Sequence, residues 1–134
     1  MPPPALTLPP MKTLLVMLGG AIGSALRYHV GGVTIRAWGP AFPWGTLIAN
    51  VSGGLCMGLL AGILARYGSA NQPWRLFLAV GVLGGYTTFS AFSLETFGMI
   101  QRGQLALAFA YILISVAGAI GALAAGLLIM RAVA

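Results

Sequence analysis

Acidic residues are almost absent from this 134-residue chain, in which Glu95 is the only acidic side chain and charged residues make up 6% of the total. A soluble domain carries about 25% charged residues, so this composition excludes a soluble globular protein. Histidine and cysteine are equally scarce, with His29 and Cys56 as the single examples. The chain therefore has no intrachain disulfide, no metal-binding cluster of side chains and no pair of nucleophile and base. An enzyme is the least favoured interpretation, and we predict no catalytic residue.

Hydrophobic residues make up 59% of the chain. They gather in runs of about 20 residues, the length of helix that crosses the hydrocarbon core of a bilayer. We predict an all-α integral membrane protein with four transmembrane helices, over residues 12–32, 45–64, 74–100 and 105–130. Residues 12–134 then form a single four-helix transmembrane domain. Residues 1–11 begin with the Pro-rich stretch "MPPPALTLPP", for which we predict a disordered tail, and Met11 is a candidate for the true start.

The cations are scattered, and they give the chain a net charge of +6. Nucleic acid is a disfavoured partner, because its binding needs cations gathered on one face. The cations suit the membrane surface, and a second interpretation, in which they concentrate anions at a pore mouth, stays open. By predicted side of the membrane they divide into Lys12, Arg66, Arg75 and Arg131 against Arg27, Arg36 and Arg102. This small bias predicts insertion in both orientations and an antiparallel dual-topology homodimer, unless other signals set the orientation.

Small residues recur at a spacing of four in every predicted helix except the third. At that spacing they let helix backbones approach closely in lipid, where no hydrophobic force drives helices together. The spacing does not say whether the contacts lie within one chain or between chains. Four thin helices enclose little room for a pathway, which favours an oligomer. The residues concerned are Gly19 and Gly23, then Gly54, Gly58 and Gly62, and finally Gly118, Ala122 and Gly126.

The third apolar run is interrupted by the stretch "GGYTTFSAFSLE", residues 84–95. Gly81, Gly84 and Gly85 each lower helix propensity by about 1 kcal/mol, and the adjacent threonines add a β-branched pair. We therefore predict that the third helix is broken near mid-membrane. A break frees backbone carbonyl oxygens, which suit a cation site. Glycines that only admit a neighbouring helix are the alternative.

Aromatic and amide groups near this stretch could receive an anion. Phe89 and Phe92 are three residues apart and share a helix face, and the edge of an aromatic ring is electropositive. Asn50 adds amide N–H donors from the second helix. This combination suits a small anion in transit. Ordinary packing is the alternative for the rings, and hydroxyls bonded back to their own helix are the alternative for Ser and Thr within the spans.

The stretch "GGYTTFSAFS" closely resembles the signature of the small bacterial fluoride channels, the Fluc or CrcB family, and "GGAIGSALRY" and "GTLIANVSGG" resemble that family's other characteristic stretches. The resemblance implies a fluoride-selective channel for passive fluoride export, located in the bacterial inner membrane among its lipids. It also implies an antiparallel homodimer with a structural sodium ion at the dimer interface, held by the backbone carbonyls of Gly84 and Thr87. The implied fluoride pathway consists of Asn50, Phe89, Phe92, Ser90, Ser93, Glu95, Tyr111 and Ser115.

The chain departs from the family pattern near the predicted break. Ala91 stands where the family usually has Thr, so either conduction is slower or a neighbouring serine supplies the hydroxyl. Tyr86 replaces a plain hydrophobe, and we predict no consequence from the sequence. Arg27 matches a basic residue at the end of the family's first helix, where reaching the membrane surface is its simpler role.

Two alternative functions remain. A small multidrug-resistance-type proton-coupled exporter also has four helices and dual topology, but it needs a carboxylate within a span. The first predicted helix has none, and Glu95 lies beyond the predicted break. A non-transporting assembly subunit would explain the small-residue spacing and would leave the predicted break and the polar residues unexplained.

Overall fold

The structure is a computed structural model that describes residue 1 and residues 10–68 and 72–133. All regular elements among these residues are helices. Four spans are long and apolar enough to cross a membrane: Met11–Trp38, Trp44–Tyr67, Gln72–Gln101 and Leu105–Ala132. The all-α prediction with four spans is therefore confirmed. Residues 2–9 of the predicted tail lie outside the described residues.

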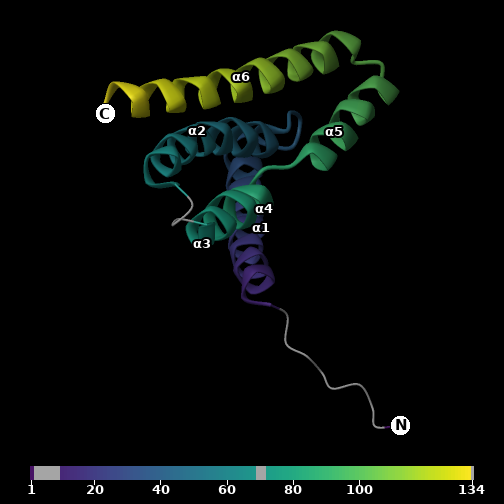
Figure 1. The fold of residues 1–134 in the computed structure, drawn as a ribbon. Coiled ribbons are helices and arrows are strands. Elements are labelled where there is room, and N and C mark those ends of the chain that lie inside the picture. Colours follow the sequence, from purple (N-terminus) through teal and green to yellow (C-terminus); the bar gives the residue numbers. More distant parts are fainter. Residues whose placement is uncertain (2–9, 69–71, 134) are drawn as a thin grey trace.

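The helices pack as two pairs. Helix α2 (Trp44–Tyr67) lies alongside α6 (Leu105–Ala132), and α1 (Met11–Trp38) lies alongside the first part of the third span (Figure 1). A methyl group added at Gly54, Gly58 or Gly62 of α2 would meet α6 at positions that advance along the chain from residue 119 to residue 130. The two helices therefore run in the same direction, as the second and fourth crossings of a membrane must.

The first pair follows the same rule. A methyl group at Gly19 would meet Phe77 and Gly81, and one at Gly23 would meet Val82 and the backbone of the following turn. Helix α1 and the first part of the third span therefore also run in the same direction. The predicted small-residue contacts at these two glycines lie within one chain.

The third span contains several kinds of helix. Helix α3 (Gln72–Trp74) leads into a π-helix, η2 (Arg75–Leu83), and then into α4 (Gly84–Tyr86). Thr87 and Thr88 have extended backbone, with ψ angles of 157° and 125°, and α5 (Phe89–Gln101) follows them. Helical geometry thus stops at Tyr86 and starts again at Phe89. The depth of this interruption in a membrane stays a prediction. The π-helix was not predicted, and nine residues are long for this rare geometry.

Two of the three glycines before the interruption serve packing against α1. A Cβ atom at Gly81 would lie 2.9 Å from the Cα of Gly19, and one at Gly85 would lie 2.5 Å from the carbonyl oxygen of Gly20. For these positions the packing alternative holds. A Cβ atom at Gly84 would come no closer than 3.7 Å to its first neighbour, which is ordinary contact. Packing within the chain does not account for Gly84.

Helix α1 is longer than predicted, since it ends at Trp38 and not at residue 32. Gly39 ends it with a φ of 79°, a conformation that favours glycine. Arg27 therefore lies well inside the helix and does not belong with the cations at its end. Without Arg27, the sides of the membrane receive Arg36 and Arg102 against the unchanged set on the other side.

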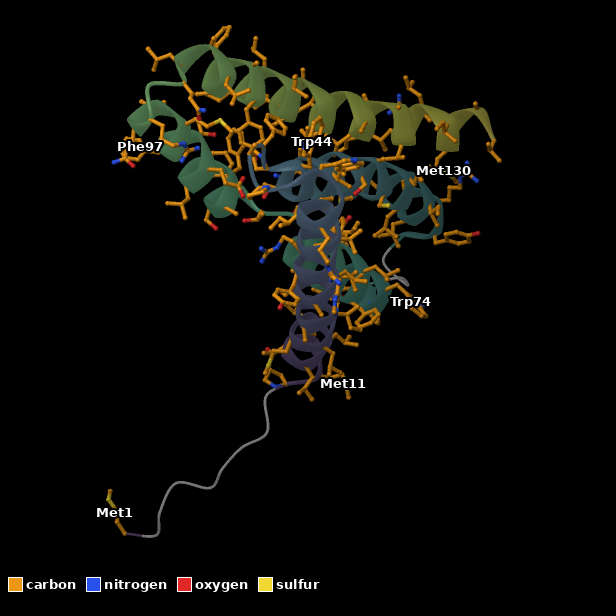
Figure 2. All side chains as sticks on the ribbon, turned by 180° about the vertical axis from the view of Figure 1, so that it is seen from behind. Met1, Met11, Trp44, Trp74, Phe97 and Met130 are labelled. Carbon is orange, nitrogen blue, oxygen red and sulfur yellow. The ribbon has the colours of Figure 1, made fainter. Side chains whose placement is uncertain are left out.

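The buried core lies between α2, α5 and α6, and consists of Leu47, Phe92, Met99, Ala108 and Tyr111. Many large apolar side chains outside it are exposed, including Phe97, which Figure 2 shows on the outer side of α5. No more than 17% of the most apolar window of any span is buried. So little internal burial leaves a surface that suits lipid or another protein chain.

Candidate ion pathway

Asn50 of α2 holds the interruption in the third span. Its amide nitrogen donates to the carbonyl oxygen of Thr88 at 3.0 Å, and its amide oxygen accepts from the Thr88 N–H at 2.8 Å. In an uninterrupted helix that N–H would bond to the carbonyl of Gly84. Asn50 therefore replaces one helical hydrogen bond and keeps one amide N–H for another acceptor.

Side chains also satisfy the backbone around Thr87 and Thr88. The Thr88 hydroxyl accepts from the N–H of Ala91 at 3.1 Å and caps α5, and the Thr87 hydroxyl donates to the carbonyl of Leu83 at 2.9 Å. On the other flank, Nε of Arg27 donates to the carbonyl of Gly85 at 3.3 Å. This bond places the guanidinium of Arg27 at the interruption, where the sequence had suggested the membrane surface.

The carbonyl oxygens of Gly84 and Thr87 have both lost their usual helical donors. The N–H that would serve Gly84 bonds to Asn50, and the N–H of Ala91, which would serve Thr87, bonds to the Thr88 hydroxyl. Among the described residues there is no cluster of three His, Cys, Asp or Glu side chains that could hold a metal. Backbone carbonyls of unwound helix are the chemistry that holds sodium in membrane proteins, so these oxygens fit such an ion.

An open groove of about 410 Å³ runs between α2, the interruption, α5 and α6. We call it the break groove, and its walls include Asn50, Thr87, Phe89, Phe92 and Ser115. The Phe89 and Phe92 rings lie 5.6 Å apart, and Phe89 is 78% exposed while Phe92 is buried. The Ser115 hydroxyl is buried without a hydrogen-bond partner among the described residues. The groove thus brings together four residues of the predicted pathway.

A second cavity of about 470 Å³ lies between the end of α1, the α1–α2 loop and α5. We call it the Glu95 cavity, because its wall includes Glu95, Thr46 and Arg102. The Glu95 carboxylate accepts from the hydroxyls of Thr46 and Tyr111, each at 2.7 Å. Both carboxylate oxygens are therefore held by neutral donors.

Tyr111 connects the two spaces. It is fully buried, its ring lies 5.2 Å from that of Phe92 at the wall of the break groove, and its hydroxyl bonds to Glu95 at the wall of the second cavity. Polar or aromatic groups therefore follow one another from Asn50 to Glu95. This order agrees with the order that the predicted pathway requires.

Ser90 and Ser93 lie apart from this line. Both are exposed, and neither lines the break groove or the Glu95 cavity. The Ser93 hydroxyl donates to the carbonyl of Phe89 at 2.8 Å, which is the bond back to its own helix that the sequence left as an alternative. The Ser90 hydroxyl lies 3.4 Å from that of Thr88. Their roles in a pathway stay predictions.

Sequence reasoning missed Thr46 and Thr88 as members of the site. Thr46 precedes Asn50 by four residues, so helical spacing places both on the same face of α2. That signal was present and could have identified Thr46. Thr88 was treated only as part of a β-branched pair, because its two roles depend on contacts with Asn50 and on the capping of α5.

These observations define a class of protein: a four-span helical membrane protein with an interrupted third span and a line of polar groups beside it. The family described as "CrcB-like protein, Camphor Resistance (CrcB)" matches residues 14–127, and the chain belongs to this family.

Several curated relatives match almost the whole chain. The "Fluoride-specific ion channel FluC 2" of Nitrobacter hamburgensis is 53% identical over 121 residues, which are 90% of this chain and 98% of the relative. The FluC proteins of Phenylobacterium zucineum and Caulobacter sp. are 56% and 54% identical over 90% of this chain and cover 95% and 94% of those relatives. The resemblance to the fluoride channel family is confirmed, and these relatives are named as channels and not as enzymes.

Proposed function

We propose that the protein is a fluoride-selective ion channel that mediates passive fluoride export. The observation that carries this proposal is its similarity, over 90% of the chain, to relatives named fluoride-specific ion channels. The exporter alternative loses ground for a separate reason. A proton-coupled exporter needs a carboxylate that exchanges its bound partner, and Glu95 already accepts from both Thr46 and Tyr111.

Fluoride passes, in this proposal, along the line from the break groove to the Glu95 cavity. The ion is small and strongly hydrated, so a narrow path must replace its water with hydrogen-bond donors. The remaining N–H of Asn50, the unpartnered hydroxyl of Ser115 and the electropositive ring edges of Phe89 and Phe92 are suited to this task. Tyr111 and Glu95 lie at the far end of the same line. Ser90 and Ser93 join the pathway only if a partner chain completes it.

We propose a structural sodium ion held by the carbonyl oxygens of Gly84 and Thr87. Both oxygens have lost their helical donors, and Gly84 is exposed on the described chain. When bound, sodium supplies a fixed positive charge near the anion path. In the absence of sodium these carbonyls would lack a strong partner, so the ion stabilises the extended geometry of Thr87 and Thr88.

The proposed assembly is an antiparallel homodimer in lipid, with its two-fold axis in the membrane plane. Such a dimer brings the interruptions of two chains together, so that each contributes two carbonyls to one ion. The exposed Phe89 and the low internal burial of every span support a partner that covers this face. The distribution of cations supports dual insertion, although removing Arg27 from the count makes the bias somewhat larger than the sequence indicated.

The proposed location is the inner membrane of a bacterium, as a multi-pass protein. The four long apolar spans and the bacterial relatives support this location. Across an energised inner membrane an anion flows outward along its electrochemical gradient, so a passive channel is sufficient for export.

The test is anion efflux from liposomes that contain the purified protein and are loaded with potassium fluoride or potassium chloride. After valinomycin is added, ion-selective electrodes should record rapid fluoride loss with chloride retained. Replacing Phe89 with Ile should abolish the flux, whereas Phe97→Ile, on the outer side of the same helix, should not. Folded protein that releases no fluoride overturns the channel proposal, and unchanged flux in Phe89→Ile removes the ring edges from it.

A further inference from the structure

Tyr86, the last helical residue before the interruption, bonds to α2 through a side chain that the proposed pathway does not use. Its hydroxyl lies 3.0 Å from the hydroxyl of Ser52. Ser52 in turn donates its only proton to the carbonyl of Ile48, at 2.5 Å. Tyr86 must therefore be the donor in its bond to Ser52. The direction of this bond follows from the single proton that each hydroxyl carries.

The rest of Tyr86 is also fixed between two helices. A Cβ atom at Gly53 of α2 would lie 3.3 Å from Cδ1 of Tyr86, so the ring rests against a glycine there. A Cβ atom at Gly23 of α1 would lie 2.7 Å from the backbone nitrogen of Tyr86. The backbone of Tyr86 therefore packs against α1, its ring packs against α2, and its hydroxyl bonds to α2.

Helix α2 thus holds both sides of the extended pair. Asn50 bonds to Thr88 on the side of α5, and Ser52 bonds to Tyr86 on the side of α4. We infer that the hydrogen bond from Tyr86 to Ser52 makes Tyr86 a positioning residue, which sets the direction of the Gly84 and Thr87 carbonyls on either side of it and thereby the affinity for sodium. This inference rests on the sodium site of the proposed function.

The role of the hydroxyl can be separated from that of the ring. In Tyr86→Phe the ring still covers Gly53, and Ser52 keeps its bond to Ile48, so no polar group is left without a partner. The variant removes only the connection between α4 and α2. Loss of one neutral hydrogen bond of this kind corresponds to about a five-fold change in an equilibrium constant.

The experiment measures thermal unfolding of the full-length protein in detergent as sodium is varied at constant ionic strength, with N-methylglucamine as the replacing cation. Tyr86→Phe should raise the sodium concentration for half-maximal stabilisation about five-fold, with little change in the unfolding temperature without sodium. Ser52→Ala should have the same effect, and the double variant should be no worse than either single variant. Tyr67→Phe, an exposed tyrosine at the end of α2, is the matched control and should equal the wild type.

An unchanged sodium midpoint in Tyr86→Phe overturns the inference, as do effects of Tyr86→Phe and Ser52→Ala that add in the double variant. A wild type that shows no sodium response overturns both the sodium site and this role of Tyr86. Liposome efflux on the same samples separates the two proposals. Absence of fluoride flux, with the sodium response and its dependence on Tyr86 intact, overturns the channel function and supports the positioning role.

Discussion

Single residues around the interruption differ in whether the chain itself satisfies their polar groups. Thr46, Thr88 and Tyr111 hydroxyls all have protein partners, whereas the buried hydroxyl of Ser115 has none among the described residues. A buried polar group without a partner costs about 1–3 kcal/mol of stability. Ser115 is therefore a residue whose presence is explained by a ligand and not by the fold.

Replacing Ser115 with Ala should for this reason separate stability from flux. We expect the free energy of unfolding to stay the same or rise by about 1 kcal/mol, because no protein hydrogen bond is lost. Fluoride efflux from liposomes should fall, because the break groove loses a donor. Ser24→Ala on the exposed side of α1 is the control and should change neither quantity. A clear loss of stability with normal efflux would assign Ser115 to the fold alone.

Asn50 has the opposite character, since the chain uses its amide fully at Thr88. Asn50→Asp keeps the size of the side chain but places an oxygen against the Thr88 carbonyl, where the amide N–H had donated. We expect a loss of about 1–3 kcal/mol in the free energy of unfolding, together with loss of fluoride flux from the added negative charge. Thermal unfolding and liposome efflux measure these effects. Gln101→Glu, which adds the same charge at the exposed end of α5, should leave both nearly unchanged; equal losses in the two variants would contradict the prediction.

At the scale of elements, the pair of α2 and α6 depends on glycines that allow backbone contact. A Cβ atom at Gly126 of α6 would lie 2.6 Å from the carbonyl oxygen of Leu55 and 2.7 Å from the nitrogen of Leu59. Backbone atoms of a helix cannot move aside as the end of a side chain can. Gly121, on the same helix, has open space at the corresponding position. The two glycines thus form a matched pair for testing this contact.

We expect Gly126→Ala to lower the free energy of unfolding by about 1–3 kcal/mol, because the added methyl group forces the helices apart. Gly121→Ala should be neutral or stabilising by up to about 1 kcal/mol, since alanine favours helix more than glycine does. Thermal unfolding of the purified proteins in detergent measures both. Equal destabilisation by the two substitutions would mean that the contact between α2 and α6 does not set the stability.

Much of the element order could be predicted from the sequence, because apolar runs and loop residues mark spans directly. The weak helix propensity around Gly84 and Thr87 also indicated where helical geometry stops. Other features depend on contacts between distant residues, which periodicity does not report. The bond between Arg27 and Gly85, the use of Asn50 by Thr88 and the bond from Tyr86 to Ser52 are of this kind. The π-helix likewise has no recognised signal in propensities.

At the scale of the whole molecule, the spans have a strict order of direction. Helix α1 runs with the first part of the third span, and α2 runs with α6, so each chain crosses the membrane as an alternating set. The cations outside these spans favour one side only weakly. The proposed dimer requires both orientations of the same chain in one membrane. Two sets of substitutions should therefore fix the orientation in opposite directions.

The first variant adds cations beside the termini and the α2–α3 loop, and the second moves the excess to the other side. Their substitutions are Gln72→Lys with Ala132→Lys, and Arg66→Gln and Arg75→Gln with Ala37→Lys and Gln101→Lys. Each variant expressed alone should insert in one orientation, as read by C-terminal reporters that are active on one side of the membrane. Each should also lose fluoride flux, because antiparallel dimers cannot form. Co-expression should restore flux, since it returns both orientations to the membrane. Normal flux from either variant alone, with a single orientation confirmed by the reporters, would contradict the antiparallel dimer.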